Sequence, residues 1–100
     1  MSNTDLEPWP FEDRPDTAAF TTSYVVIDLK PVVHVARDLE GNWQFLSEEG
    51  ADESQIKTVA LKTLLSKHPE LRQIADLPLG WEAWRLDEKA PWNKRRDPDT

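Results

Sequence analysis

His34 is a candidate for acid–base chemistry, because the charge of histidine changes near neutral pH. It stands between Val33 and Val35 in a run that favours a strand, so it should point away from the face that these valines share. There it could act as the general base of a hydrolase, with Asp38 or another nearby carboxylate. A partly exposed strand position is the simpler interpretation, since no second histidine lies at metal-ligand spacing.

The acidic loop that follows residue 47 is a second candidate site. Its carboxylates are those of Glu48, Glu49, Asp52 and Glu53. The stretch 38–53 contains six acidic residues and no lysine or arginine. Residues 48–53 do not match a calcium-binding EF-hand loop, so we expect a solvated loop whose charge attracts a basic partner.

Several kinds of site are excluded because the residues they need are absent or scarce. The sequence has no cysteine, and therefore no thiolate nucleophile, disulfide or cysteine-based metal site. Its three glycines form no phosphate-binding loop, and no serine stands in a Gly-x-Ser-x-Gly setting. We therefore expect no cofactor, no metal ion and no enzymatic activity.

The charge balance bears on the class of partner. Nineteen acidic and twelve basic residues give a net charge of −7. Binding to nucleic acid requires a basic stripe, and the basic cluster at 94–96 is followed by Asp97 and Asp99. We expect no nucleic-acid partner. An acidic surface favours a basic protein partner, although it also keeps a small protein soluble.

Length and hydropathy limit the number of domains and the cellular location that the sequence allows. No run of 18 or more apolar residues exists, and the acidic start lacks the apolar core of a secretory signal. The sequence therefore predicts a cytoplasmic protein that does not cross a membrane. With 100 residues, it can form one domain with a two-layer core.

The first half of the chain predicts an arm followed by strands. Residues 1–18 contain three prolines and no periodic pattern, which predicts an extended acidic arm. Residues 21–29 are rich in β-branched side chains and predict a strand. Short strands are predicted over 32–37 and 43–47, and the five residues between them, with a Gly-Asn pair, predict a hairpin turn.

The second half predicts two helices. Residues 56–60 fit either a short strand or the first turn of a helix that ends at Lys67. His68 is expected to close that helix, and Pro69 to begin a second one, which ends before Pro78. Residues 81–86 then predict a last strand.

These elements predict an α+β fold. A small antiparallel or mixed sheet of four or five strands should carry the helix pair on one face. The domain is expected to span 19–87, and 88–100 to be a mostly flexible tail. Alternate residues should fill the interior of the sheet: Val25, Ile27, Val33, Val35 and Phe45.

Tryptophans are the remaining candidates for binding a partner. Trp81 and Trp84 point to opposite faces of the predicted last strand, so one can be exposed near Arg85, a composition frequent in interface hot spots. Trp9 and Trp92 stand beside prolines, and either hold the terminal segments on the core or anchor a partner. The partner-binding candidates are Glu48, Glu49, Asp52, Glu53, Trp81, Trp84, Arg85 and Trp9.

Three motifs carry a family resemblance: Pro-Phe-Glu-Asp at 10–13, Trp-Gln-Phe at 43–45 and Leu-Pro-Leu-Gly-Trp-x-Ala-x-Arg at 77–85. With them, residues 10 to 92 resemble a family of small bacterial proteins of unknown function, distantly similar to immunity proteins that neutralise toxins in bacterial competition. His68 departs from that pattern, in which an Asp would cap the following helix. The resemblance implies no catalytic residues.

Three functions follow as expectations. The first is a non-enzymatic protein-binding module, an immunity-like inhibitor of a basic toxin. The second is a self-associating housekeeping or accessory domain without a toxin partner. The third, remote alternative is a hydrolase that uses His34. We expect a monomer or a weak homodimer.

Overall fold

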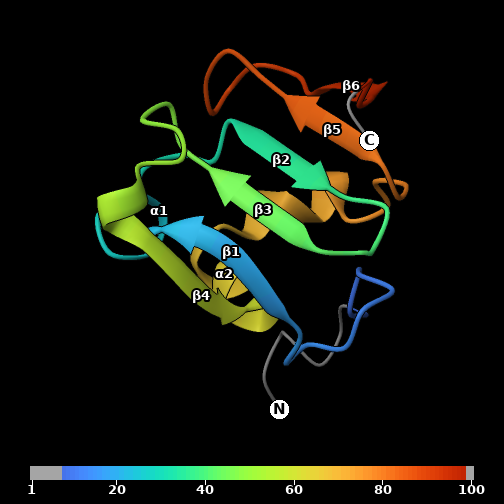
Figure 1. The fold of residues 1–100 in the computed structure, drawn as a ribbon, viewed down its shortest axis with the longest axis horizontal. Coiled ribbons are helices and arrows are strands. Elements are labelled where there is room, and N and C mark those ends of the chain that lie inside the picture. Colours follow the sequence, from blue (N-terminus) through green and yellow to red (C-terminus); the bar gives the residue numbers. More distant parts are fainter. Residues whose placement is uncertain (1–7, 99–100) are drawn as a thin grey trace.

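A mixed six-stranded sheet forms the centre of the protein (Figure 1). The computed structural model describes residues 8–98. The strand order is β4-β1-β3-β2-β5-β6, with β1 and β3 parallel and all other neighbours antiparallel. The elements are β1 (Ala18–Thr22), α1 (Ser23–Val26), β2 (His34–Arg37), β3 (Trp43–Leu46), η2 (Glu53–Gln55), β4 (Ile56–Ala60), α2 (Leu61–Lys67), η3 (Pro69–Ile74), β5 (Trp81–Trp84) and β6 (Asn93–Arg96).

The predicted α+β class is confirmed, with six strands in place of four or five. The predicted hairpin joins β2 to β3, with Arg37 opposite Trp43. At its turn, one carboxylate oxygen of Asp38 accepts hydrogen bonds from the backbone N–H groups of Glu40 and Asn42, both at 2.9 Å. Hydrogen bonds from Asn42 also lower the pKa of Asp38. Gly41 has φ 91°, a conformation that glycine adopts without strain.

The predicted strand over 21–29 is wrong beyond Thr22, because the chain there turns into α1. The β-branched residues favour a strand, but tertiary contacts select a helical turn. The Ser23 hydroxyl donates to the Gln55 side chain, and the Tyr24 hydroxyl donates to Asp52 at 2.8 Å. Ile27, expected in the interior, is 65% exposed.

The other four residues expected in the interior differ in how deeply they are buried and in which element contains them. Val35 and Phe45 are fully buried in the sheet, as predicted. Val25 is also fully buried, but it lies in α1, and Val33 is half-buried in the loop before β2. The alternation rule holds only where the backbone is a strand.

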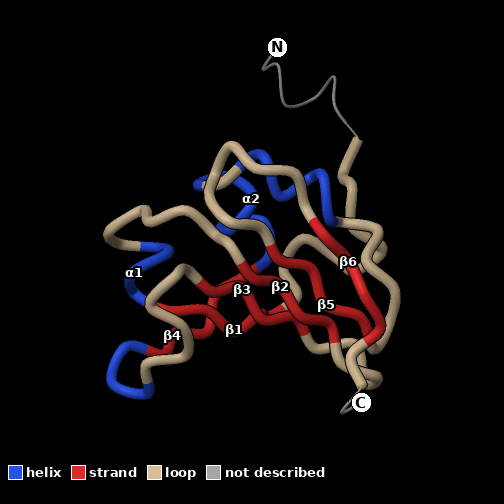
Figure 2. Tube along the Cα trace, turned by 90° about the horizontal axis from the view of Figure 1, so that it is seen from above, coloured by secondary structure: helices blue, strands red, loops and turns tan. Residues whose placement is uncertain are grey.

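The helical segments α2 and η3 lie on one side of the sheet (Figure 2). Leu61 and Leu64 of α2 and Leu71 and Ile74 of η3 are fully buried in the same core cluster as the sheet residues. The ambiguous segment 56–60 is strand β4, and the predicted second helix is a 3₁₀ helix. His68 closes α2, and its Nε2 lies 2.8 Å from the backbone oxygen of Val25.

The part of the predicted arm that the structure describes, 8–17, contains no helix or strand and packs on the core. Phe11 is 5% exposed, and its ring makes an edge contact with Trp43, centroid to centroid 5.2 Å. Asp13 accepts a hydrogen bond from Trp43 Nε1 at 3.0 Å and lies 3.5 Å from Arg37 Nη2. Apolar burial and charge pairing thus anchor this segment; the rest of the predicted arm, 1–7, lies outside the described residues.

The prediction of a mostly flexible tail after residue 87 also needs correction, because this segment contains β6. Strand β6 pairs with β5, with Glu82 opposite Arg95 and Trp84 opposite Asn93. Arg95 Nε donates to Glu82 at 2.8 Å. Every side chain of β6 is exposed, so its sequence lacks the apolar alternation by which a strand is predicted.

Candidate functional site

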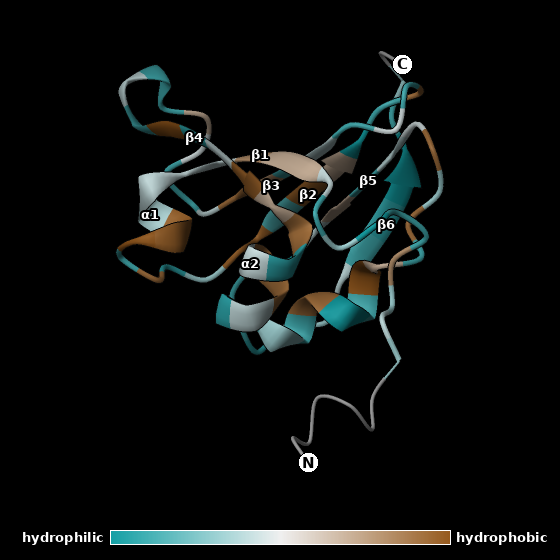
Figure 3. Cartoon of the chain, turned by 90° about the horizontal axis from the view of Figure 1, so that it is seen from below, coloured by the Kyte–Doolittle hydropathy of each residue, from teal (hydrophilic) through white to brown (hydrophobic). Residues whose placement is uncertain are grey.

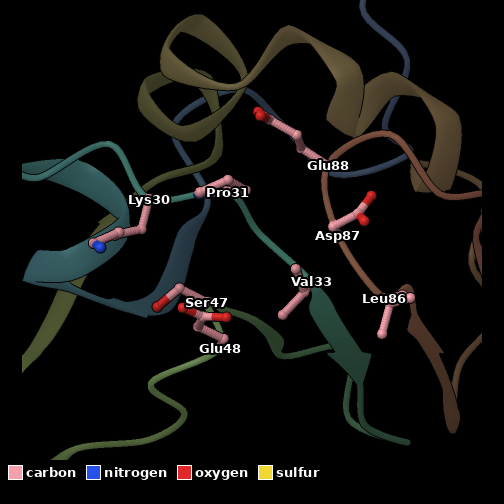
Figure 4. Close-up of a pocket in the computed structure, with 8 residues that line it drawn as sticks. All are labelled: Lys30, Pro31, Val33, Ser47, Glu48, Leu86, Asp87 and Glu88. Carbon is pink, nitrogen blue, oxygen red and sulfur yellow. The ribbon is translucent and has the colours of Figure 1, made fainter.

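Three loops meet at one end of the sheet and surround a shallow cavity of about 190 Å³ (Figure 4). The loop before β2, the loop after β3 and the loop after β5 each supply part of the wall. The lining residues are Lys30, Pro31, Val33, Ser47, Glu48, Leu86, Asp87 and Glu88. We refer to this cavity as the loop-end pocket.

The loop-end pocket combines apolar walls with an acidic rim. Pro31, Val33 and Leu86 supply apolar surface, and Leu86 is 88% exposed. Glu48, Asp87 and Glu88 are exposed carboxylates. A surface with both properties can accept the aliphatic stem and the cationic head of a lysine or arginine from a partner.

The cation of the pocket, Lys30, is paired with an acid of the neighbouring loop. Its Nζ lies 3.8 Å from Glu49 Oε2. The Ser47 hydroxyl donates to Glu49 Oε1 at 2.6 Å, and this bond is the main reason why the pKa of Glu49 is lowered. Glu49 therefore stays ionised and offsets the charge of Lys30, which leaves the rim negative.

Arg85 holds two walls of the pocket together from inside the protein. It is 5% exposed, and its Nε donates to the backbone oxygen of Val32 at 2.9 Å. Its Nη1 donates to the backbone oxygen of Glu88 at 3.1 Å. Burial lowers the pKa of Arg85, and the carboxylates of Glu70, Glu88 and Asp87 oppose this effect.

Of the sequence-predicted residues, Glu48 lies in the pocket and Glu49 beside it. Asp52 and Glu53 belong to the turn before β4, where Asp52 accepts hydrogen bonds from Ser54 and Tyr24 that lower its pKa. The predicted acidic loop therefore divides, with one half at the pocket and the other at the edge of the sheet.

The predicted aromatic residues and Arg85 do not form a surface with the acidic loop. Trp81 is partly buried against the core, and Trp9 packs against Phe11 with its Nε1 donating to the Asp13 backbone oxygen at 2.6 Å. Arg85 is buried behind the pocket, so it cannot contact a partner directly. Of the three candidate tryptophans, Trp84 is exposed, at 37%, whereas Trp9 and Trp81 are half-buried.

Sequence reasoning missed Leu86, Asp87 and Glu88, because the sequence predicts Leu86 at the end of the last strand, Asp87 at the end of the domain and Glu88 at the start of a tail. The adjacent acids Asp87 and Glu88, directly after an apolar residue, resemble the acidic loop in composition. That likeness is the signal that could have found them. Their closeness to Glu48 depends on the sheet order, which places β2 between β3 and β5.

His34 lies on the helix-free face of the sheet, between Leu46 and Trp84 on the flanking strands. Its Nε2 is 2.9 Å from Glu82 Oε1. Asp38, the carboxylate that the sequence suggested as a partner of His34, is held in the hairpin turn instead. Within residues 8–98, the hydrogen bond of the His34 side chain is therefore made with Glu82.

The described part of the chain contains neither a cluster of metal ligands nor a membrane-spanning helix. There, no three histidine or acidic side chains gather as ligands for a metal ion. No helix within 8–98 has the length and apolar character needed to cross a membrane. Comparison with protein-family models, with curated proteins and with solved structures finds no match to this chain.

Proposed function

We propose that this protein is a non-enzymatic protein-binding module that takes a basic segment of another protein at the loop-end pocket. An immunity-like inhibitor of a basic toxin is the form of this function that the family resemblance favours. The observation that carries the proposal is the combination of apolar walls, Pro31 and Leu86, with a rim of three exposed carboxylates.

Charge complementarity defines the partner. A lysine or arginine side chain of the partner would place its stem on Pro31, Val33 and Leu86, and its cation among Glu48, Asp87 and Glu88. Exposed carboxylates of this kind act mainly on the rate of association, which falls as salt screens them. The apolar contacts would oppose dissociation and depend little on salt.

The experiment compares two triple variants of equal charge. The first, Glu48→Gln with Asp87→Asn and Glu88→Gln, neutralises the pocket. The control, Asp16→Asn with Glu40→Gln and Asp76→Asn, neutralises three exposed carboxylates that do not line it. Each is used to capture proteins from a lysate of the source cells, and the association rate of the captured protein is then measured at low and high salt.

The proposal predicts that the wild-type protein and the control capture the same basic protein and associate with it at similar rates. The pocket variant should associate about tenfold more slowly at low salt, with a weaker dependence on salt. Equal rates for the two triple variants would show that the partner binds elsewhere.

A further inference from the structure

The two edges of the sheet differ in how they are protected against pairing. Strand β6 carries Lys94, Arg95 and Arg96 among its four residues, and Figure 3 shows it as strongly hydrophilic. Charged edge strands of this kind resist pairing with another chain. Strand β4 has the sequence Ile-Lys-Thr-Val-Ala, with one charge and no proline. By this measure, β4, with Lys57 as its one charge, is the less protected edge.

One side of β4 is available for pairing. Its five residues pair with β1 from Ala18 opposite Ala60 to Thr22 opposite Ile56. Within residues 8–98, no strand pairs with the other side of β4. Ile56, Lys57 and Thr58 are exposed, and Val59 and Ala60 are half-buried. Such an edge is a template for strand addition.

The charges at the two ends of β4 identify the strand that would be added. Glu53 lies in the turn just before β4, and Lys62 lies just after it, at the start of α2. Both side chains are exposed, and neither forms an ion pair with another described residue. An antiparallel second copy of β4 would bring the acidic end of each strand to the basic end of the other, twice in one interface.

We propose that β4 is the interface of a weak symmetric homodimer, in which two copies of this strand pair antiparallel about Thr58. A two-fold axis between antiparallel strands requires one residue to face its own copy, and Thr58 is the central residue of β4. Ile56 then lies opposite Ala60 of the second copy, and Lys57 opposite Val59. Each pair brings apolar side-chain surface of one copy against that of the other across the dimer interface.

The inference goes beyond the proposed function, because none of the residues that line the loop-end pocket belongs to β4. A five-residue strand pair is a small interface, so the dimer is expected to be weak and to form in a concentration-dependent manner.

Sedimentation velocity over a wide range of protein concentration tests this dimer. Thr58→Glu places a carboxylate opposite its own copy, so the dissociation constant of the dimer should rise at least about tenfold. Thr58→Val keeps a β-branched side chain at the axis and should dimerise at least as well as the wild type. Thr58 is exposed in the monomer, so both variants should fold, which circular dichroism verifies.

A charge exchange provides an independent test of the strand orientation. Glu53→Lys and Lys62→Glu should each weaken the dimer, because like charges then meet at both ends of the interface. The double variant, with both changes, should restore the wild-type dissociation constant. In a parallel arrangement, like charges would already meet at both ends in the wild type, so neither single variant would weaken the dimer.

Three results would overturn the proposal. The first is a wild-type protein that sediments as a monomer at every concentration. The second is a Thr58→Glu variant that dimerises like the wild type. The third is a dimer that survives Thr58→Glu but is lost on Trp84→Ala, since this would place the interface on the helix-free face of the sheet.

Discussion

The guanidinium carbon of Arg85 lies 4.3 Å from the centroid of the Trp92 ring. Arg85 also donates to the backbone oxygens of Val32 and Glu88, so one buried cation joins the segment before β2, the loop after β5 and the segment that leads into β6. The motif Leu-Pro-Leu-Gly-Trp-x-Ala-x-Arg ends at this residue. Its arginine therefore supports the loop-end pocket from behind.

Replacing Arg85 should destabilise the whole protein. Arg85→Met keeps much of the apolar volume but leaves the Val32 and Glu88 oxygens without their donor, and the free energy of unfolding should fall by about 2–4 kcal/mol. Urea unfolding followed by tryptophan fluorescence measures this change. Arg95→Met is the control, because Arg95 is an exposed residue whose loss should cost about 1 kcal/mol or less. Equal losses for the two variants would contradict the supporting role of Arg85.

Asp13 should stabilise the fold by holding the N-terminal segment on the sheet. Asp13→Ala removes the acceptor of the buried Trp43 Nε1 and a carboxylate 3.5 Å from Arg37. We expect a loss of about 1–3 kcal/mol in the free energy of unfolding. Asp16→Ala, which removes a partner of the exposed Arg14, should change it by less than about 0.5 kcal/mol. An Asp13→Ala variant as stable as the wild type would show that this carboxylate does not hold the segment on the sheet.

Glu82 should contribute to stability in a pH-dependent way. Hydrogen bonds from His34, and then from Arg95, lower its pKa below the ordinary value of 4.5. The unfolded chain therefore binds a proton more readily than the folded protein, so this contribution is present above that value and is lost as the pH falls below it. Between about pH 5 and pH 3, the free energy of unfolding should fall less steeply in Glu82→Gln than in the wild type. Identical slopes would show that these hydrogen bonds of Glu82 are not maintained in solution.

Lys30 should slow the association of a basic partner, because it is the cation that lines the loop-end pocket. Lys30→Met makes the pocket more negative and should raise the association rate about two- to fivefold at low salt. Stopped-flow fluorescence with the partner of the proposed function measures this rate. Lys67→Met, at the end of α2, changes the net charge equally and should have a smaller effect. If Lys30→Met associates more slowly, Lys30 itself contacts the partner.

The β2–β3 hairpin and α2 could be predicted from sequence because their determinants are local. The Gly-Asn turn lies between two short apolar runs. Asp38 accepts hydrogen bonds from backbone N–H groups of the same turn, those of Glu40 and Asn42. The leucines of α2 recur at helical spacing, and Pro69 marks the following helical segment. Alternation also predicted that Trp81 and Trp84 point to opposite faces of the last strand, and in β5 Trp81 is partly buried against the core whereas Trp84 is exposed.

Tertiary contacts decided the features whose determinants lie far apart in the chain. Tyr24 belongs to a β-branched run, yet its bond to Asp52 helps to hold a helical turn there. Strand β6 has no apolar pattern, yet all four of its residues pair with β5, and Arg95 donates to Glu82 on that neighbouring strand. The loop-end pocket depends on Glu48 lying near Asp87 and Glu88, almost forty residues later in the sequence. Local propensity carries no information about such pairings, which the sheet order alone establishes.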